Sequence, residues 1–158
     1  MRNINTRRGI RLFGNVGSGK TMIMRIMTEM FAAFKFHYAT QVAENYEDGD
    51  PILKKLGRNS VFKVSDGKYI LHHACIDDIG KEENASRNFR KAKNVIGEIL
   101  DSRYINWINY GLKTHITDNL TPEEIISRYG DRVESRICQM TNMIILGGSK
   151  GSTDWRKI

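Results

Sequence analysis

The first segment able to do chemistry is a glycine-rich stretch near the N-terminus. It fits the pattern G-x-x-x-x-G-K-[ST] at every fixed position, with an expected strand before it and an expected helix after it. Glycines let the backbone curl so that successive N–H groups surround a phosphate, and the start of a helix adds its positive dipole end. This Walker A pattern therefore predicts binding of ATP or ADP. The expected nucleotide-binding residues are Gly14, Asn15, Val16, Gly17, Ser18, Gly19, Lys20, Thr21 and Met22.

Two adjacent carboxylates supply the acidic partner that this loop requires. Asp77 and Asp78 follow an apolar run, 57 residues after Lys20. Ligands of open α/β sheets bind at the carboxyl ends of the strands, where these residues are expected. In this Walker B interpretation Asp77 holds Mg²⁺ through water, the Thr21 hydroxyl completes the shell of the ion, and Lys20 reaches the β- and γ-phosphates. Asp78 orients or deprotonates the attacking water.

A polar tip is expected on the neighbouring strand. The residues Thr117-Asp118-Asn119 end a short apolar segment. The amide of Asn119 is placed to hydrogen-bond the attacking water or the γ-phosphate. Asparagine is also common in turns, so this assignment depends on the loop and on the acidic pair.

The positions between these motifs alternate between short apolar runs and helical periodicity. This alternation predicts a three-layer α/β/α domain with a five-stranded parallel sheet. The expected strands are 9–13, 37–40, 69–76, 114–117 and 142–146. The expected helices are 19–34, a short one after Pro51, 86–107 with Phe89, Ala92, Ile96, Ile99 and Leu100 on its inner face, one capped by Thr121 with Pro122 and Glu124, and one that starts at Asp131. Residues 41–68 are otherwise ambiguous, apart from a turn at 65–67.

Composition bounds the class of protein. The chain has 158 residues and a formal net charge of +7, which suits one domain with a polyanionic ligand or partner. It contains no apolar run long enough for a membrane span and no signal-peptide core, so we expect a cytoplasmic protein without a membrane partner. Cys75 and Cys138 lie in apolar runs and are expected to be buried, reduced thiols.

Other nucleotide-binding classes fit less well. The chain lacks the N-K-x-D motif of GTPases and the L-S-G-G-Q signature of transporter ATPases, and it is too short for a two-lobed helicase motor. A small-molecule kinase stays open by size, although the arginine-bearing lid typical of such kinases is not evident. A nucleotide-gated binding module with negligible turnover also stays open.

Four segments in order resemble one family. They are Gly14-Asn-Val-Gly-Ser-Gly-Lys-Thr21, Ile76-Asp-Asp-Ile-Gly80, Thr117-Asp-Asn-Leu-Thr-Pro-Glu-Glu124 and Ser127-Arg-Tyr-Gly-Asp-Arg-Val-Glu-Ser-Arg-Ile137. Together they resemble the DnaC/DnaI-type helicase loaders of the AAA+ ATPases, to which IstB-type transposition ATPases are closely related. The resemblance implies slow ATP hydrolysis in DNA replication, a replicative helicase or transposase-type partner, single-stranded DNA and an active homo-oligomer.

The resemblance also assigns three arginines. Arg136, and as second choice Arg132, match the segment that presents an arginine finger to ATP on a neighbouring subunit. Arg156 resembles the terminal arginine of related loaders, which acts as a sensor 2. Residues 1–158 are thus expected to form a single AAA+ domain, without a helical lid and without an N-terminal partner-binding domain. An IstB-type transposition ATPase would share all of these residues and remains the alternative.

Overall fold

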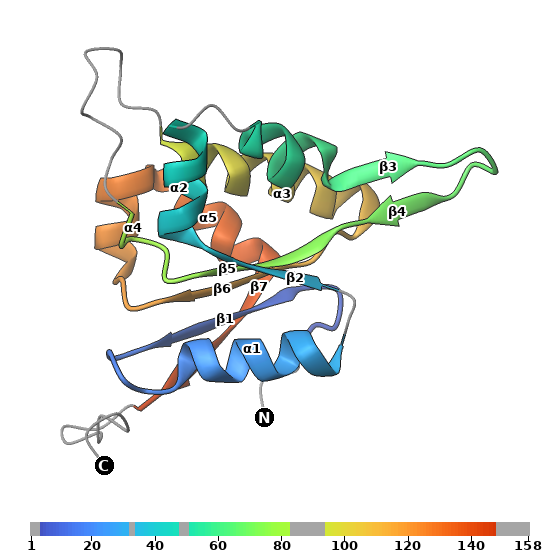
Figure 1. Cartoon of the computed structure of the whole chain (residues 1–158). Coiled ribbons are helices and arrows are strands. Elements are labelled where there is room, and N and C mark those ends of the chain that lie inside the picture. Colours follow the sequence, from blue (N-terminus) through green and yellow to red (C-terminus); the bar gives the residue numbers. More distant parts are fainter. Residues whose placement is uncertain (1–3, 32–33, 48–50, 83–93, 148–158) are drawn as a thin grey trace.

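The centre of the computed structural model is a five-stranded parallel sheet in the order β2-β5-β6-β1-β7 (Figure 1). The structure describes residues 4–31, 34–47, 51–82 and 94–147. The parallel sheet and its number of strands agree with the sequence prediction. The strands are β1 (Gly9–Gly14), β2 (Phe34–Tyr38), β5 (His73–Asp77), β6 (Thr114–Asp118) and β7 (Thr141–Leu146).

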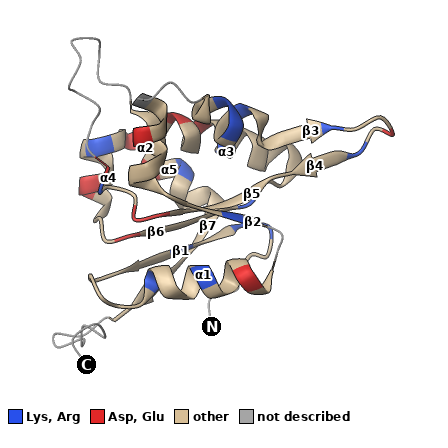
Figure 2. Ribbon diagram, viewed as in Figure 1, with Lys and Arg blue, Asp and Glu red and all other residues tan. Residues whose placement is uncertain are grey.

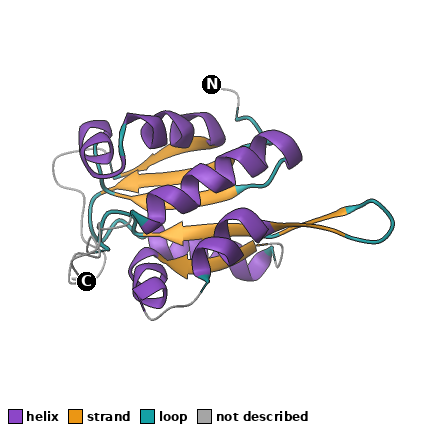
Figure 3. Ribbon diagram, turned by 90° about the horizontal axis from the view of Figure 1, so that it is seen from above, coloured by secondary structure: helices purple, strands orange, loops and turns teal. Residues whose placement is uncertain are grey.

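Helices cover both faces of this sheet, which gives the predicted three layers. Helix α1 (Lys20–Met30) packs on one face through a small core that includes Leu12 and Met24. The other face is covered by several helices that share one larger core (Figures 1 and 3). These helices are α2 (Ala39–Glu47), α3 (Val95–Tyr110), α4 (Pro122–Tyr129) and α5 (Asp131–Met140).

The start of α4 illustrates how local sequence sets an element boundary. The Thr121 hydroxyl accepts a hydrogen bond from the Glu124 N–H at 3.3 Å, and the Glu124 carboxylate accepts one from the Thr121 N–H at 2.7 Å. This reciprocal pair satisfies two N–H groups that a helix start leaves unbonded, and Pro122 at the first position needs no donor. The predicted cap is confirmed.

The predicted strand 69–76 is wrong in one respect, because the chain changes sheets at His72. Residues Tyr69–Leu71 form β4, which pairs antiparallel with β3 (Val61–Lys63) in a separate two-stranded sheet. The His72 N–H continues this pairing by donating to Ser60 O at 2.8 Å, whereas β5 begins at His73. The hairpin turns where predicted, with Gly67 at φ 77°, and it projects from the body of the protein (Figures 1 and 3).

The boundary between α1 and β2 also differs from the prediction. Helix α1 ends at Met30 rather than near residue 34, and β2 starts at Phe34 rather than at His37. Phe34 is buried in the small core and stacks on His115 with ring centroids 4.6 Å apart. Tertiary packing therefore overrides the helical periodicity that extends to this residue.

Helix α3 begins at Val95, and the predicted start at residue 86 lies outside the described residues. The Asn94 side chain caps it by accepting a hydrogen bond from the Gly97 N–H at 2.8 Å. The predicted inner-face residues Ile96, Ile99 and Leu100 are buried, while Phe89 and Ala92 lie outside the described residues.

The two cysteines differ in their environment. Cys75 on β5 is buried, as predicted, but Cys138 on α5 is exposed and donates to Glu134 Oε1 at 3.0 Å. The apolar neighbours of Cys138 misled the prediction, because on a helix they face other directions. Among the described residues, no helix has the length and apolar content that crossing a membrane requires.

Candidate functional site

The glycine-rich loop lies between β1 and α1, where the sequence predicted it. Gly17 and Gly19 adopt positive φ values of 83° and 85°, which side-chain-bearing residues rarely adopt. The Lys20 ammonium group donates to Gly14 O at 2.7 Å and to Asn15 O at 2.9 Å. The lysine is therefore held inside the loop that it follows. Burial lowers the pKa of Lys20, and the Asp78 carboxylate opposes this shift.

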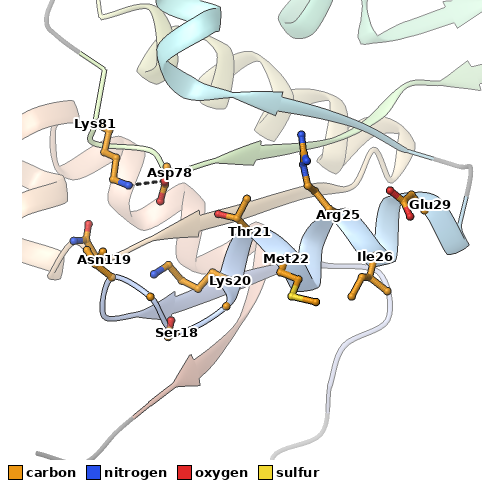
Figure 4. A pocket seen from close by; sticks show the side chains of 13 residues that line it. Ser18, Lys20, Thr21, Met22, Arg25, Ile26, Glu29, Asp78, Lys81 and Asn119 are labelled. Carbon is orange, nitrogen blue, oxygen red and sulfur yellow. Dashed lines mark hydrogen bonds and ion pairs between the residues drawn. The ribbon is translucent and has the colours of Figure 1, made fainter. Parts of the chain in front are cut away.

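A cavity of about 500 Å³ opens over this loop, and Figure 4 shows the side chains around it. The amino group of Lys20 points toward the side where Asp78, Lys81 and Asn119 lie, while Met22 and Ile26 project from the other side of α1. The cavity brings three of the predicted catalytic residues together. Its lining consists of Val16, Gly17, Ser18, Gly19, Lys20, Thr21, Met22, Arg25, Ile26, Glu29, Asp78, Lys81 and Asn119.

Asp77 ends β5 and is fully buried beside the loop. Its Oδ2 accepts a hydrogen bond from the Thr21 hydroxyl at 3.0 Å, and its Oδ1 accepts one from the Thr117 hydroxyl at 2.6 Å. Burial raises the pKa of Asp77, and the two hydroxyl hydrogen bonds partly offset this shift. The predicted metal-binding pair, Thr21 and Asp77, is thus in direct contact. Adjacent hydroxyl and carboxylate oxygens are the hard ligands that Mg²⁺ takes in phosphate sites, so this donor pair fits the ion.

Asp78 adopts a backbone conformation that is rare for a residue with a side chain, with φ 59°. Its N–H donates to the Thr117 hydroxyl at 2.8 Å, which fixes the turn after β5. Its Oδ2 lies 2.6 Å from the Lys81 ammonium nitrogen, and both residues line the cavity. The predicted water-activating carboxylate therefore faces the cavity with a lysine beside it.

Strand β6 lies between β1 and β5, so its end stands between the loop and the acidic pair. Asn119, immediately after β6, lines the cavity as predicted. Just before it, Asp118 forms a two-point ion pair with Arg11 of β1, at 2.7 Å to Nε and 2.8 Å to Nη2. Both residues are buried, and the pair ties the ends of the two strands together.

Sequence analysis missed three contributors to this site: Thr117, Lys81 and the Arg11–Asp118 pair. A lone arginine inside an apolar strand was a usable signal, because a buried charge needs a partner. For Thr117 the position at the strand end was visible, but the sequence gave no way to see that its hydroxyl bridges Asp77 and Asp78.

The two arginine-finger candidates lie elsewhere. Both are on α5, on the sheet face that carries the larger core, and neither lines the cavity. Arg136 contacts Asp101 of α3 at 2.5 Å and lies over the Tyr104 ring at 4.9 Å, and Arg132 pairs with the same aspartate. The Arg132 side chain is 71% exposed and that of Arg136 is 21% exposed. Arg156 lies outside the described residues.

Comparison with solved structures shows that other proteins share this α/β fold. The crystal structure of the DnaC helicase loader matches with a TM-score of 0.60 and 20% identity, over 91% of this chain and 81% of that chain. The crystal structure of DnaI matches with a TM-score of 0.63 and 20% identity, over 93% and 74% of the two chains. AMPPCP-bound DnaA from Aquifex aeolicus matches with a TM-score of 0.52 and 15% identity, over 88% and 40%.

At these identities the likeness establishes the fold. No protein-family model matches the chain, and no curated protein matches it in sequence. The function therefore has to be argued from the site.

Proposed function

We propose that this chain is a Mg²⁺-dependent ATPase of the helicase-loader type that acts in DNA replication. The observation that carries the proposal is the contact between Thr21 and Asp77 beside a glycine-rich loop whose cavity also holds Lys20, Asp78 and Asn119. The AAA+ fold shared with a helicase loader and with nucleotide-bound DnaA supports the same class.

Each residue has a role in this proposal. Lys20 leaves its loop carbonyls to contact the β- and γ-phosphates, while the loop N–H groups hold the phosphate oxygens. Thr21 and Asp77 hold Mg²⁺, which when bound neutralises charge on the phosphate oxygens. Asp78 accepts the proton of the attacking water, and Asn119 orients that water or contacts the γ-phosphate. Thr117 keeps both aspartates in position through its hydroxyl.

An arginine from a second copy completes the site in this proposal. Neither Arg132 nor Arg136 lines the cavity of its own chain, so either one must act on a neighbour. The exposure of Arg132 makes it the better candidate, since Arg136 is held between Asp101 and Tyr104. This order reverses the preference drawn from the sequence. The active state is accordingly a homo-oligomer.

The partners follow from the proposed class. A replicative helicase is the protein partner, and single-stranded DNA is the polymer that the positive net charge suits. A pull-down that offers both a replicative helicase and a transposase tests this point. Retention of the transposase alone would favour the IstB-type alternative.

The central experiment measures ATP binding and hydrolysis on the full chain. Wild type should bind a fluorescent ATP analogue, and Lys20→Ala should weaken binding about 100-fold or more, because it removes a charge that contacts two phosphates. Lys68→Ala, at the hairpin turn, is the matched control and should bind normally. Hydrolysis should rise with protein concentration.

Three outcomes would contradict parts of the proposal. Equal ATP binding by wild type and Lys20→Ala would remove the nucleotide site. Phosphate transfer to a small acceptor by dilute monomer would favour a kinase. Normal hydrolysis by both Arg132→Ala and Arg136→Ala would remove the finger, whereas partial rescue of Arg132→Ala by Lys20→Ala subunits would support it.

A further inference from the structure

A second cavity, of about 320 Å³, lies at the end of the sheet opposite to the glycine-rich loop. It opens where β2 and β5 begin, whereas Asp77 ends β5 at the first cavity. Figure 2 shows basic positions on β2 and on the short helical segments Leu53–Gly57 and Arg58–Ser60, which pack against α3. No carboxylate is among the residues that line it in the described part of the chain. Its basic lining residues are Lys35, His37, Lys55, His72, His73 and Arg103.

The guanidinium of Arg103 is the most constrained of these groups, because it is completely buried. Every acceptor that the structure gives it is neutral, and no described carboxylate contacts it. Burial lowers the pKa of Arg103 to about 9, so the group is still a cation at pH 7. Its acceptors are the Thr114 hydroxyl at 2.8 Å and the carbonyls of Leu56 at 2.8 Å, His72 at 3.1 Å and Lys113 at 3.1 Å.

A buried charge with only neutral partners is unfavourable, and a counter-ion in the adjoining cavity relieves it. Lys35 adds a second positive charge from β2. The described residues that line this cavity thus include cations and no carboxylate, which makes its field positive. An anion is the ligand that this charge arrangement fits.

The histidines are suited to donate hydrogen bonds to such an anion. His73 Nδ1 accepts from the Lys113 N–H at 2.8 Å, so a neutral His73 carries its proton on Nε2. Burial lowers the pKa of both His37 and His73, and the Arg103 charge lowers it further. At pH 7 these rings are neutral N–H donors rather than additional cations.

The rim of the cavity adds an aromatic surface. Phe62 of β3 is 43% exposed and lies next to the His72 ring, with centroids 5.1 Å apart. Exposed aromatic rings beside a cationic groove stack on nucleobases. The volume of the cavity is near the lower limit for small-molecule sites. It is larger than a bare phosphate needs.

We propose that this second cavity binds the phosphate group of a nucleotide, with the base against Phe62 at the rim, and that the nucleotide is either free or part of a DNA single strand. Lys35 and Arg103 supply the charge, and His37 and His73 supply directed donors. The site is separate from the glycine-rich loop and does not depend on ATP binding there.

The test uses the full chain with Lys20→Ala, so that nucleotide binding at the glycine-rich loop is strongly weakened. Thymidine 5′-monophosphate and a ten-residue oligothymidylate are titrated while the imidazole resonances of the histidines are followed by NMR. Both probes should shift the resonances of His37 and His73 at pH 7. A similar affinity for the two probes identifies a free nucleotide as the source, and much tighter binding of the oligonucleotide identifies a DNA strand.

Two substitutions with the same charge change separate a site from general electrostatic attraction. Lys35→Glu should weaken binding about tenfold or more, whereas Lys68→Glu at the hairpin turn should weaken it less than about twofold. Lys35→Gln, which removes the charge without reversing it, should weaken binding about threefold and guards against a folding defect in Lys35→Glu.

The proposal is overturned if neither nucleotide probe shifts the histidine resonances at millimolar concentration. It is also overturned if Lys35→Glu and Lys68→Glu weaken binding equally. Because the glycine loop is disabled throughout, these results are independent of whether the chain hydrolyses ATP.

Discussion

At the carboxyl ends of the strands, two cations stand next to carboxylates of the same chain. Arg11 is paired with Asp118, and Lys81 with Asp78. At the amino ends of the same strands, Arg103 is surrounded by a hydroxyl and three carbonyls. The first end pairs these two cations with carboxylates, which suits the metal–phosphate complex that we propose for it, because that complex brings both signs. The second end is unbalanced, and a simple anion would complete it.

The largest expected effect concerns the balanced end. Arg11→Met leaves Asp118 buried without its partner, so the free energy of unfolding should fall by about 3 to 5 kcal/mol. The double variant Arg11→Met/Asp118→Leu removes both charges and should recover most of this loss. Urea unfolding of the three proteins measures the difference. If the single variant lost less than about 1 kcal/mol, Asp118 would not depend on Arg11 as its counter-charge, and the prediction would be wrong.

A pH-dependent loss is expected at the opposite end, where burial lowers the pKa of His115 to about 4. Between pH 6.5 and 4 the unfolded chain binds a proton that the folded chain does not, so stability should fall with pH across this window. The contribution of this residue is about 3 kcal/mol, from 1.36 kcal/mol per pKa unit.

The matched variant for this prediction is His115→Asn. It keeps an acceptor for the Ile10 N–H, which donates to His115 Nδ1 at 3.3 Å, but it cannot be protonated. The difference in unfolding free energy between variant and wild type should therefore change in favour of the variant as the pH falls from 7 to 4. A pH-independent difference would show that His115 does not contribute to acid sensitivity.

The fold was largely predictable because its signals are local. The cap at Thr121 and the glycines at 17 and 19 impose their geometry through neighbouring backbone groups. The break between the two sheets at His72 was not predictable from the sequence. The segment 69–76 is apolar-rich on both sides of the break, and its pairing with residues 60–63 depends on tertiary contacts.

The same distinction applies to the sites. The pattern of residue types and spacings located Lys20, Thr21 and Asp77, because each lies at the end of a strand or in the first turn of a helix. The bridging role of Thr117 and the isolation of Arg103 arise from residues that are 40 positions or more away, Asp77 in one case and Leu56 in the other. No local pattern encodes which charges end up without a counter-charge.

A smaller effect is expected when the bridge between the two aspartates is removed. Thr117→Val keeps the shape of the side chain but deletes the hydrogen bonds to Asp77 and from the Asp78 N–H. ATP hydrolysis should fall about 10- to 100-fold, or about 1.4 to 2.7 kcal/mol, because the Asp77 carboxylate and the backbone of Asp78 each lose a hydrogen bond that fixes them. Thr117→Ser should retain most of the activity. Unchanged hydrolysis in Thr117→Val would remove Thr117 from the site.

The smallest effect is expected at Lys81, whose ion pair with Asp78 is partly exposed on both sides. Such a pair contributes at most about 1 kcal/mol, so Lys81→Gln should change the free energy of unfolding by no more than about 0.5 kcal/mol. Hydrolysis should rise about two- to fivefold, because Oδ2 of Asp78 is then available to the attacking water. The wild-type rate should also respond more to added salt than the variant rate, since salt screens this pair.

Lys68→Gln removes the same charge from a position outside the cavity and should leave the rate of hydrolysis unchanged. A fall of more than about tenfold in Lys81→Gln would contradict the prediction and would indicate that Lys81 contacts the phosphate itself. In that case the first cavity would contain a second phosphate-binding lysine. Lys81 would then serve the ligand, and it would not be the counter-charge of Asp78. The sign of this one rate change therefore decides whether the two ends of the sheet differ as described.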